Sequence, residues 1–181
     1  MYSVVKKENT HKINQTSNIM RGLRNNNPLN IRHSKDRWQG IATTQTDKEF
    51  VQFQTMAYGY RAAWKTLQTY YKRLRERKKH YTVENIIRRW APPQENDTNS
   101  YIRTVLALSG IGGQENLLPP ENVMSYNRLS SLIAAMTVVE NGIRPHQVDQ
   151  EAIYQGYRLA FPQHAQELDE WMLGEDEYGE W

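Results

Sequence analysis

The sequence feature that most constrains the fold is an apolar helix pattern that runs into an acidic residue, Glu140. Residues 128–141 place apolar side chains at intervals of three and four, the spacing of one helix face: Leu129, Leu132, Ile133 and Met136. Glu140 is the next position on that face. Asn141 and Gly142 follow, and both residue types tolerate the left-handed conformation that ends helices. The pattern predicts a helix ending beside Glu140, with the carboxyl of Glu140 directed toward the interior.

An acid in this position is expected to hold its proton unusually well. Burial disfavours the charged form of a carboxyl, and so does the negative end of a helix dipole, so both effects raise the pKa. A carboxylic acid that stays protonated near neutral pH is what a glycosidase needs as its general acid. The alternative is that Glu140 is an ordinary, partly exposed acid at a helix end.

Length and composition are those of one globular domain. The chain has 181 residues, of which 38% are hydrophobic, and this is enough to bury a core. No run approaches the roughly 20 apolar residues of a membrane span, and no apolar signal segment is visible at the start. Cysteine is absent and the five histidines show no ligand spacing. We therefore expect no metal, no cofactor and no membrane span.

Charge is distributed unevenly along the chain. Residues 61–89 carry ten Lys or Arg against two Glu, whereas residues 167–181 carry seven acids and no basic residue. The densest basic run, residues 72–79, is expected to form an exposed ridge that meets an anionic surface. The alternatives are a solvated helix face or, ranked low, a nucleic-acid-binding surface, because the chain lacks a recognisable helix-turn-helix signature.

The chain divides into an arm, a loop-rich segment and a series of helices. Residues 1–18 are polar and predict a flexible N-terminal arm. Residues 21–53 are turn-rich and end in a short predicted strand, Phe50–Phe53, which suggests a small hairpin. Downstream, apolar spacing and capping residues predict helices over 58–78, 82–90, 96–109, 128–141 and 148–160. We expect one domain over 19–165 and an acidic C-terminal tail over 166–181.

Asparagines and aromatic residues supply candidate ligand contacts. Side-chain amides offer paired donors and acceptors that suit sugar hydroxyls and N-acetyl groups, and four asparagines cluster in one turn: Asn25, Asn26, Asn27 and Asn30. Structural Asx turns are the alternative, favoured for two of the four. Flat aromatic faces for sugar rings are expected from one or two of Trp38, Tyr58, Trp90 and Tyr101, the others being core.

Several segments together resemble a family of phage and prophage proteins that are described as virion structural proteins or lysozyme-like cell-wall hydrolases. The resemblance covers about residues 20–160 and rests on five segments: Arg21–Arg32, Trp38-Gln39-Gly40, the strand Phe50–Phe53, Tyr58–Ala62 and Arg89–Asn96. A second, weaker resemblance is to the glucosaminidases and lytic transglycosylases of the lysozyme superfamily. In those enzymes a helix ending in Glu-Ser-Gly precedes an Asn-rich segment and a Trp-x-Gly hairpin. Here the acid helix comes last, as in a circular permutation, and Asn141 replaces the serine.

The resemblances imply a mainly α (α+β) lysozyme-like domain with a small β-hairpin. They imply an enzyme of bacterial peptidoglycan with Glu140 as general acid and Glu49 as a second carboxylate beside Asp47. The alternative interpretation is that Glu49 is an ordinary exposed acid on a hairpin. The expected substrate-binding residues are Asn26, Asn27, Asn30, Trp38, Gln39, Tyr58 and Tyr101. The rival function is a non-enzymatic virion or wall-binding protein. In either case the chain is expected to be made in the bacterial cytoplasm and to reach the virion or the cell wall.

Overall fold

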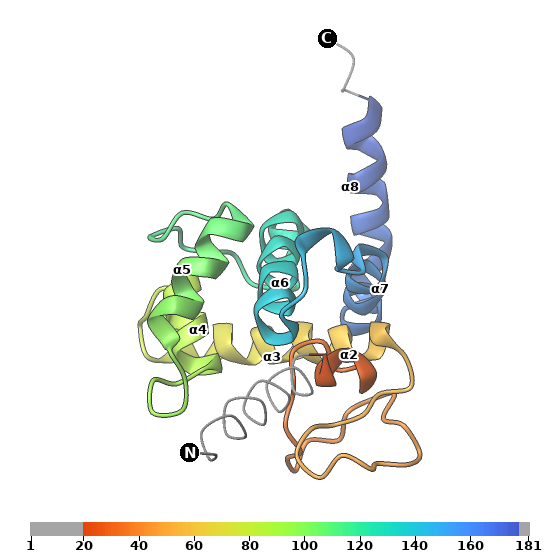
Figure 1. Cartoon of the computed structure of the whole chain (residues 1–181). Helices are drawn as coiled ribbons and strands as arrows, with labels where there is room; N and C mark the ends of the chain where they lie inside the picture. Colours follow the sequence, from red (N-terminus) through yellow and green to blue (C-terminus); the bar gives the residue numbers. More distant parts are fainter. Residues whose placement is uncertain (1–19, 178–181) are drawn as a thin grey trace, which may run out of the picture.

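A computed structural model describes residues 20–177 and shows a mainly helical protein (Figure 1). The longer helices are α3 (Met56–Glu76), α4 (Val83–Trp90), α5 (Thr98–Ser109), α6 (Tyr126–Asn141), α7 (Gln150–Ala160) and α8 (Ala165–Glu177). Shorter turns of helix are α2 (Arg21–Arg24), η1 (Val123–Ser125), η2 (Pro145–Gln147) and η3 (Pro162–His164). The mainly α class is confirmed, whereas the arm predicted over residues 1–18 lies outside the described residues.

The helix ends follow the capping residues that the sequence provides. The Thr82 side chain accepts a hydrogen bond from the backbone N–H of Asn85 and caps α4. At the other end of the fold, Gly142 takes a left-handed φ of 61° and stops α6 one residue after Asn141. The five predicted helices are therefore present, and their ends lie within about two residues of the expected positions.

The helix α3 organises the core. In Figure 1 it crosses the molecule beneath α6, with α4 and α5 toward one side and α7 and α8 toward the other. Trp64 of α3 is fully buried, and its indole N–H donates to the carbonyl of Ile153 in α7 over 3.1 Å. The ring of Tyr157 meets the Trp64 ring edge-on at a centroid distance of 5.1 Å. Aromatic packing therefore joins α3 to α7 at the centre of the protein.

The small β-hairpin expected in the loop region is not seen. Among the described residues, pairing in this region is limited to two isolated antiparallel bridges, Arg32 with Phe50 and Ile41 with Phe53. The backbone of residues 50–53 makes single bonds to both neighbouring segments: the N–H of Val51 donates to the carbonyl of Ile31, and the carbonyl of Gln52 accepts from the N–H of Ala42, each over 2.9 Å. The N–H of Phe53 donates to the carbonyl of Asn25 over 2.9 Å, and the carbonyl of Val51 accepts from the side-chain amide of Asn27 over 2.8 Å. These scattered bonds do not add up to the continuous ladder of a hairpin.

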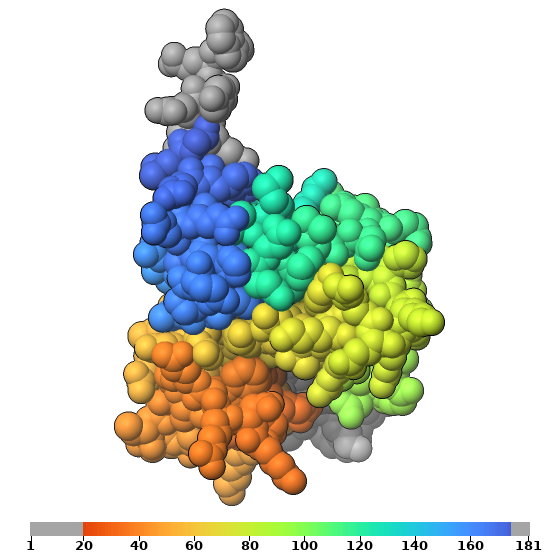
Figure 2. Space-filling model, turned by 180° about the vertical axis from the view of Figure 1, so that it is seen from behind, coloured from red at the N-terminus to blue at the C-terminus, as the bar shows by residue number. Residues whose placement is uncertain are grey.

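The loop region is nevertheless firmly attached to α3. Ile31, Val51 and Phe53 are buried together with Ala62 of α3 in a second, small hydrophobic cluster. Gly59 of α3 permits the close approach, because a Cβ there would lie 2.0 Å from the carbonyl oxygen of Asn26. Figure 2 shows the loop residues, in orange, directly against the band of α3.

The acidic segment that begins at residue 166 forms α8 as far as Glu177. Leu168 is fully buried, so this helix is anchored, although its C-terminal part extends away from the rest of the fold in Figure 1. Within residues 20–177, no helix combines the length and the apolar character needed to cross a membrane.

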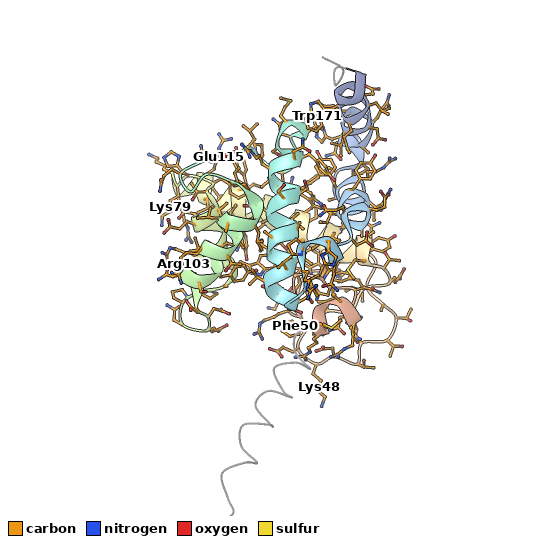
Figure 3. All side chains as sticks on the ribbon, turned by 45° about the horizontal axis from the view of Figure 1, so that its top comes forward. Lys48, Phe50, Lys79, Arg103, Glu115 and Trp171 are labelled. Carbon is orange, nitrogen blue, oxygen red and sulfur yellow. The ribbon has the colours of Figure 1, made fainter. Side chains whose placement is uncertain are left out.

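The basic run at the end of α3 is exposed as expected. Every residue from 72 to 79 except Leu74 is exposed. We call the four cations of this run that follow Leu74 the basic ridge: Arg75, Arg77, Lys78 and Lys79. Figure 3 places Lys79 well away from Lys48 and Phe50 of the loop region.

Candidate functional site

Glu140 lies in the last turn of α6, where three side chains donate hydrogen bonds to its carboxyl. One oxygen, Oε1, accepts from the indole Nε1 of Trp90 over 3.1 Å and from the hydroxyl of Tyr101 over 2.8 Å. The other oxygen, Oε2, accepts from the amide Nδ2 of Asn30 over 3.0 Å. The donors come from the end of α4, from α5 and from the loop after α2. The carboxyl is therefore the point at which three separate segments meet.

The environment raises the pKa of Glu140 above its ordinary value of 4.5, and burial is the largest cause. The hydrogen bonds from Asn30, Tyr101 and Trp90 oppose this shift because they stabilise the charged form. The positive charge of Arg32 acts in the same opposing direction. Burial outweighs the donors, so the carboxyl holds its proton to a higher pH than an exposed glutamate. The direction agrees with the expectation from its place on the apolar face of α6.

Asn141 holds the loop after α2 against the end of α6. We call this loop, residues 25–30, the asparagine loop. Its side chain is fully buried, and its Nδ2 donates to the carbonyl of Pro28 over 2.7 Å and to that of Thr137 over 3.0 Å. Asn30, two residues after Pro28, takes a left-handed φ of 51° that directs its amide to Glu140. Asn141 therefore holds the loop that reaches the acid.

The other asparagines of the cluster hold the loop together. Asn27 is fully buried; its Nδ2 donates to the carbonyls of Ile31 and Val51, and its Oδ1 accepts from the N–H of Ile31. These bonds show that Asn27 holds the loop together, and its predicted contact with a substrate stays a prediction. Asn26 similarly donates to the carbonyl of Phe53 over 3.1 Å. Of the cluster, Asn30 contacts the acid.

The predicted aromatic residues separate into two groups. Tyr101 is buried and presents its hydroxyl to Glu140 rather than an open face. Tyr58 packs in the small cluster behind the loop, as does Trp38, which also lines a cleft described below. Gln39 is exposed beside Trp38. The donor role of Trp90 was missed, because sequence spacing identified a flat aromatic surface but not its partner. The Trp-Ala-Pro-Pro segment that ends α4 was the available signal.

Glu49 is held in ion pairs with two arginines. Its carboxyl pairs with Arg21 over 3.0 Å and also with Arg32. Neighbouring Asp47 binds Arg21 over 2.6 Å, and this guanidinium keeps the pKa of Asp47 well below its usual range. Asp47 also accepts from the backbone N–H groups of Glu49 and Phe50, so it is a structural anchor of the loop. Arg32 is the link between the two acids, since it binds Glu49 and its charge acts on Glu140.

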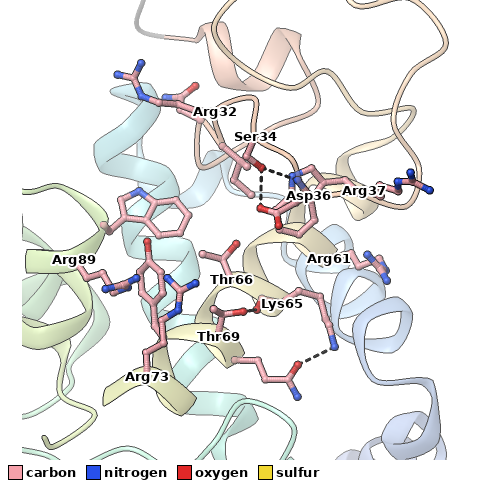
Figure 4. A pocket seen from close by; sticks show the side chains of 16 residues that line it. Arg32, Ser34, Asp36, Arg37, Arg61, Lys65, Thr66, Thr69, Arg73 and Arg89 are labelled. Atoms are coloured by element: carbon pink, nitrogen blue, oxygen red, sulfur yellow. Dashed lines mark hydrogen bonds between the residues drawn. The ribbon is translucent and has the colours of Figure 1, made fainter. Parts of the chain in front are cut away.

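A cleft of about 630 Å³ lies between loop residues 30–38 and the face of α3, and α4 closes one end (Figure 4). We call it the basic cleft, because six cationic side chains line it: Arg32, Arg37, Arg61, Lys65, Arg73 and Arg89. Asn30 and Trp90 line it too, whereas Glu140 does not. The acid lies directly behind those two residues, at the wall of the cleft. Sequence reasoning did not foresee this arrangement, since arginines in a loop carry no periodic signal.

No cluster of metal ligands occurs in the part of the chain that the structure describes: nowhere do three or more His, Cys, Asp or Glu side chains gather to hold an ion. The polar groups around Glu140 are an amide, an indole N–H and a phenol, which donate hydrogen bonds to an acid. These groups hold the carboxyl of Glu140 in a fixed position.

Comparison with known proteins identifies a relative from a phage. No family model matches the chain. Over 150 residues the chain is 35% identical to Protein P5 of Pseudoalteromonas phage PM2, and the match covers 81% of this chain and 86% of that protein. Fold and match together define a mainly helical protein that is related to a phage protein. More particularly, the chain belongs to the family of Protein P5 of phage PM2. That name states no activity, so an argument about function has to rest on the chemistry of the site.

Proposed function

We propose that this phage protein cleaves the β-1,4 glycan strands of peptidoglycan, with Glu140 as the general acid. The observation that carries the proposal is the carboxyl of Glu140, whose pKa is raised by burial and whose position is fixed by Asn30, Trp90 and Tyr101. General acids of glycosidases need this combination of a retained proton and a fixed orientation. The lysozyme-like resemblance of the sequence motifs gives further support. No cofactor is required for such chemistry.

The hydrogen bonds indicate which oxygen carries the proton. Oε1 already accepts from Trp90 and Tyr101, whereas Oε2 accepts from Asn30 alone. The proton therefore belongs on Oε2. Its transfer to the glycosidic oxygen accompanies cleavage of the bond between that oxygen and the anomeric carbon, and positive charge develops on the sugar. The N-acetyl oxygen of the substrate, or a hydroxyl or water that gives its proton back to the Glu140 carboxylate, then supplies the electron pair that neutralises this charge.

A one-acid mechanism fits the surroundings better than a two-carboxylate mechanism. Glu49 is committed to Arg21 and Arg32, and these ion pairs favour a positioning role over nucleophilic attack. Lytic transglycosylases use one acid because the substrate supplies its own nucleophile. The expected product is therefore an anhydro-sugar, which the mass spectrum of a peptidoglycan digest distinguishes from a reducing end by the mass of one water.

The test is Glu140→Gln, which keeps the size of the side chain and removes the transferable proton. We expect the clearing of purified cell walls to fall by roughly 10²–10⁴-fold, the usual contribution of a general acid, while binding to walls persists. The matched control is Glu115→Gln, since Glu115 pairs with Arg128 on a distant surface and does not contact the site. Unchanged clearing by Glu140→Gln would refute the proposal.

A non-enzymatic virion or wall-binding protein is the second candidate. It is favoured by the three donors that already bond to the carboxyl of Glu140, because a purely structural acid would be satisfied in the same way. Sedimentation with purified walls separates the two functions. A binding protein would pellet with the walls and release no soluble fragments, whereas an enzyme releases fragments that depend on Glu140.

A further inference from the structure

The basic cleft carries more positive charge than the described side chains balance. Six cations line it, and the carboxylate among its lining residues is Asp36, which accepts a hydrogen bond from Ser34. Of the six, Arg32 pairs with Glu49. Among the described side chains, the other five form no ion pair with a carboxylate. Like charges gathered in a concave surface attract and concentrate anions, so the cleft is suited to an anionic ligand.

Several of these cations are held in place by uncharged groups. The ammonium of Lys65 donates to the amide oxygen of Gln68 over 2.8 Å and lies 5.0 Å from the centre of the Phe161 ring. The guanidinium of Arg89 lies 4.9 Å from the centre of the Tyr70 ring. Its Nε is buried and has no hydrogen-bond partner among the described residues. Burial lowers the pKa of Lys65, which indicates that its charge is incompletely compensated by the protein.

The cations extend along the cleft and occupy both walls. Arg61, Lys65 and Arg73 lie four and eight residues apart on α3, and at 1.5 Å per residue this row extends over roughly 18 Å. Arg32 and Arg37 come from the loop on the opposite wall, as Figure 4 shows. A single small anion would engage one part of this row. The arrangement instead suits an extended ligand with several negative groups.

The aromatic side chains of the cleft are poorly placed for nucleobases. Non-specific binding of single-stranded nucleic acid combines a basic groove with open aromatic faces on which bases stack. Here the face of Tyr70 is covered by Arg89, and the ring of Trp90 lies against the Tyr70 ring at a centroid distance of 6.1 Å. Trp38 packs against the small cluster behind the loop. The hydroxyls of Thr66 and Thr69, also in the lining, suit a peptide or sugar equally well.

We infer that the basic cleft binds the acidic stem peptides of a peptidoglycan strand and so positions the strand for Glu140. This inference rests on the proposed glycosidase function. The sugars of such a strand are uncharged once their lactyl groups are joined to peptide, whereas the stem peptides carry free carboxylates. Only the stem peptides can therefore form ion pairs with a row of cationic side chains. Asn30 and Trp90 line the cleft and also donate hydrogen bonds to Glu140. A strand bound in the cleft would therefore lie beside the acid.

The binding experiment uses the full chain carrying Glu140→Gln. Both probes are a soluble peptidoglycan fragment, a tetrasaccharide with its stem peptides, whose amines are acetylated. The acidic probe keeps its carboxylates, and the neutral probe has them converted to amides. We expect the acidic fragment to bind at least about tenfold more tightly in calorimetry, the sum of several exposed charge pairs. Equal binding of the two fragments would overturn the inference, and so would tighter binding of an oligothymidylate of matched charge.

Two exposed cations, one from each wall, test whether the cleft is the binding surface. The double variant Arg37→Gln with Arg73→Gln is expected to remove most of the preference for the acidic fragment. The matched control is Arg77→Gln with Lys79→Gln, which removes the same charge from the basic ridge and should keep the preference. If both double variants lost the preference for the acidic fragment equally, the preference would come from the overall positive charge of the protein, and the inference would be overturned.

Turnover separates this inference from the proposed function. If both hold, the cleft variant raises KM for the acidic fragment, leaves kcat nearly unchanged and has little effect on the amidated fragment. If the wild-type chain cleaves both fragments equally well, the glycosidase function stands and the stem-peptide inference fails. If the wild-type chain cleaves neither, the glycosidase function fails, and calorimetry still decides whether the cleft selects carboxylates.

Discussion

The hydroxyl of Tyr101 provides the most direct test of how the protein sets the acidity of Glu140. It donates to Oε1 over 2.8 Å from a buried position, and this bond stabilises the carboxylate. Tyr101→Phe keeps the ring in the core and removes the donor. Trp90 remains bonded to Oε1 and Asn30 to Oε2, so the carboxyl should stay in place. The change is therefore expected to raise the pKa of Glu140 further.

The size of the shift follows from the strength of the lost bond. A hydrogen bond to a charged group contributes about 1.5–3 kcal/mol, and one pKa unit corresponds to about 1.4 kcal/mol, so we expect a rise of about one to two units. The direction of the pKa shift also determines how folding stability depends on pH. Because the folded-state pKa of Glu140 already exceeds the ordinary 4.5, folding stability falls as pH rises from that value to the folded pKa. Tyr101→Phe should extend this fall to higher pH.

The pKa can be measured by a carbon-13 NMR titration of the Glu140 carboxyl in protein labelled at glutamate. If Glu140 is a general acid, the alkaline limb of the wall-clearing profile should move upward by the same amount, because the acid works only when protonated. Tyr81→Phe is the control, since its buried hydroxyl donates to the carbonyl of Leu67 and does not contact Glu140. An unchanged or lowered pKa in Tyr101→Phe would refute this account of the site.

Three further variants test the loop and the basic ridge. Asn27→Ala leaves buried groups of Ile31 and Val51 unpaired and should lower the free energy of unfolding by about 3 kcal/mol or more in urea titrations. Asp47→Asn weakens the pair with Arg21, so its melting temperature should fall at neutral pH, and this deficit should shrink as pH drops below the ordinary 3.8. The third variant replaces all four residues of the basic ridge by glutamine: Arg75, Arg77, Lys78 and Lys79. The rate of wall clearing should fall and depend less on salt, whereas the turnover of a soluble glycan should stay unchanged.

Helices were predictable here because their signals are local. Apolar spacing and capping residues within about a dozen positions determine where each helix begins and ends. The acidic segment after residue 165 was harder to interpret, because charge suggested a tail, while a few apolar residues such as Leu168 bury themselves and support α8. The hairpin prediction was wrong for a different reason. Residues 50–53 share their backbone bonds among Ile31, Ala42 and the side-chain amide of Asn27, so no continuous pair of strands forms.

The site was predictable in part. The position of Glu140 on an apolar face indicated an interior acid, and asparagine and tyrosine were expected near it. Which asparagine reaches the acid was not predictable, because Asn27 and Asn30 differ only in how the folded loop directs them. The basic cleft was also hidden in the sequence. Its cations come from a loop, from α3 and from α4, and their meeting depends on packing between elements rather than on spacing within any one of them.

The contact between the asparagine loop and the end of α6 decides whether the site exists. Asn30 and Glu140 lie 110 residues apart in sequence, and the bond from Asn141 to Pro28 spans 113 residues. Each helix can form from local signals without this contact, but the acid then lacks a donor and a cleft wall. What the chemistry requires is a loop docked on the last turn of the acid helix, and either order of the two segments along a chain can provide that docking. A rotated segment order is therefore no physical obstacle to the proposed glycosidase function.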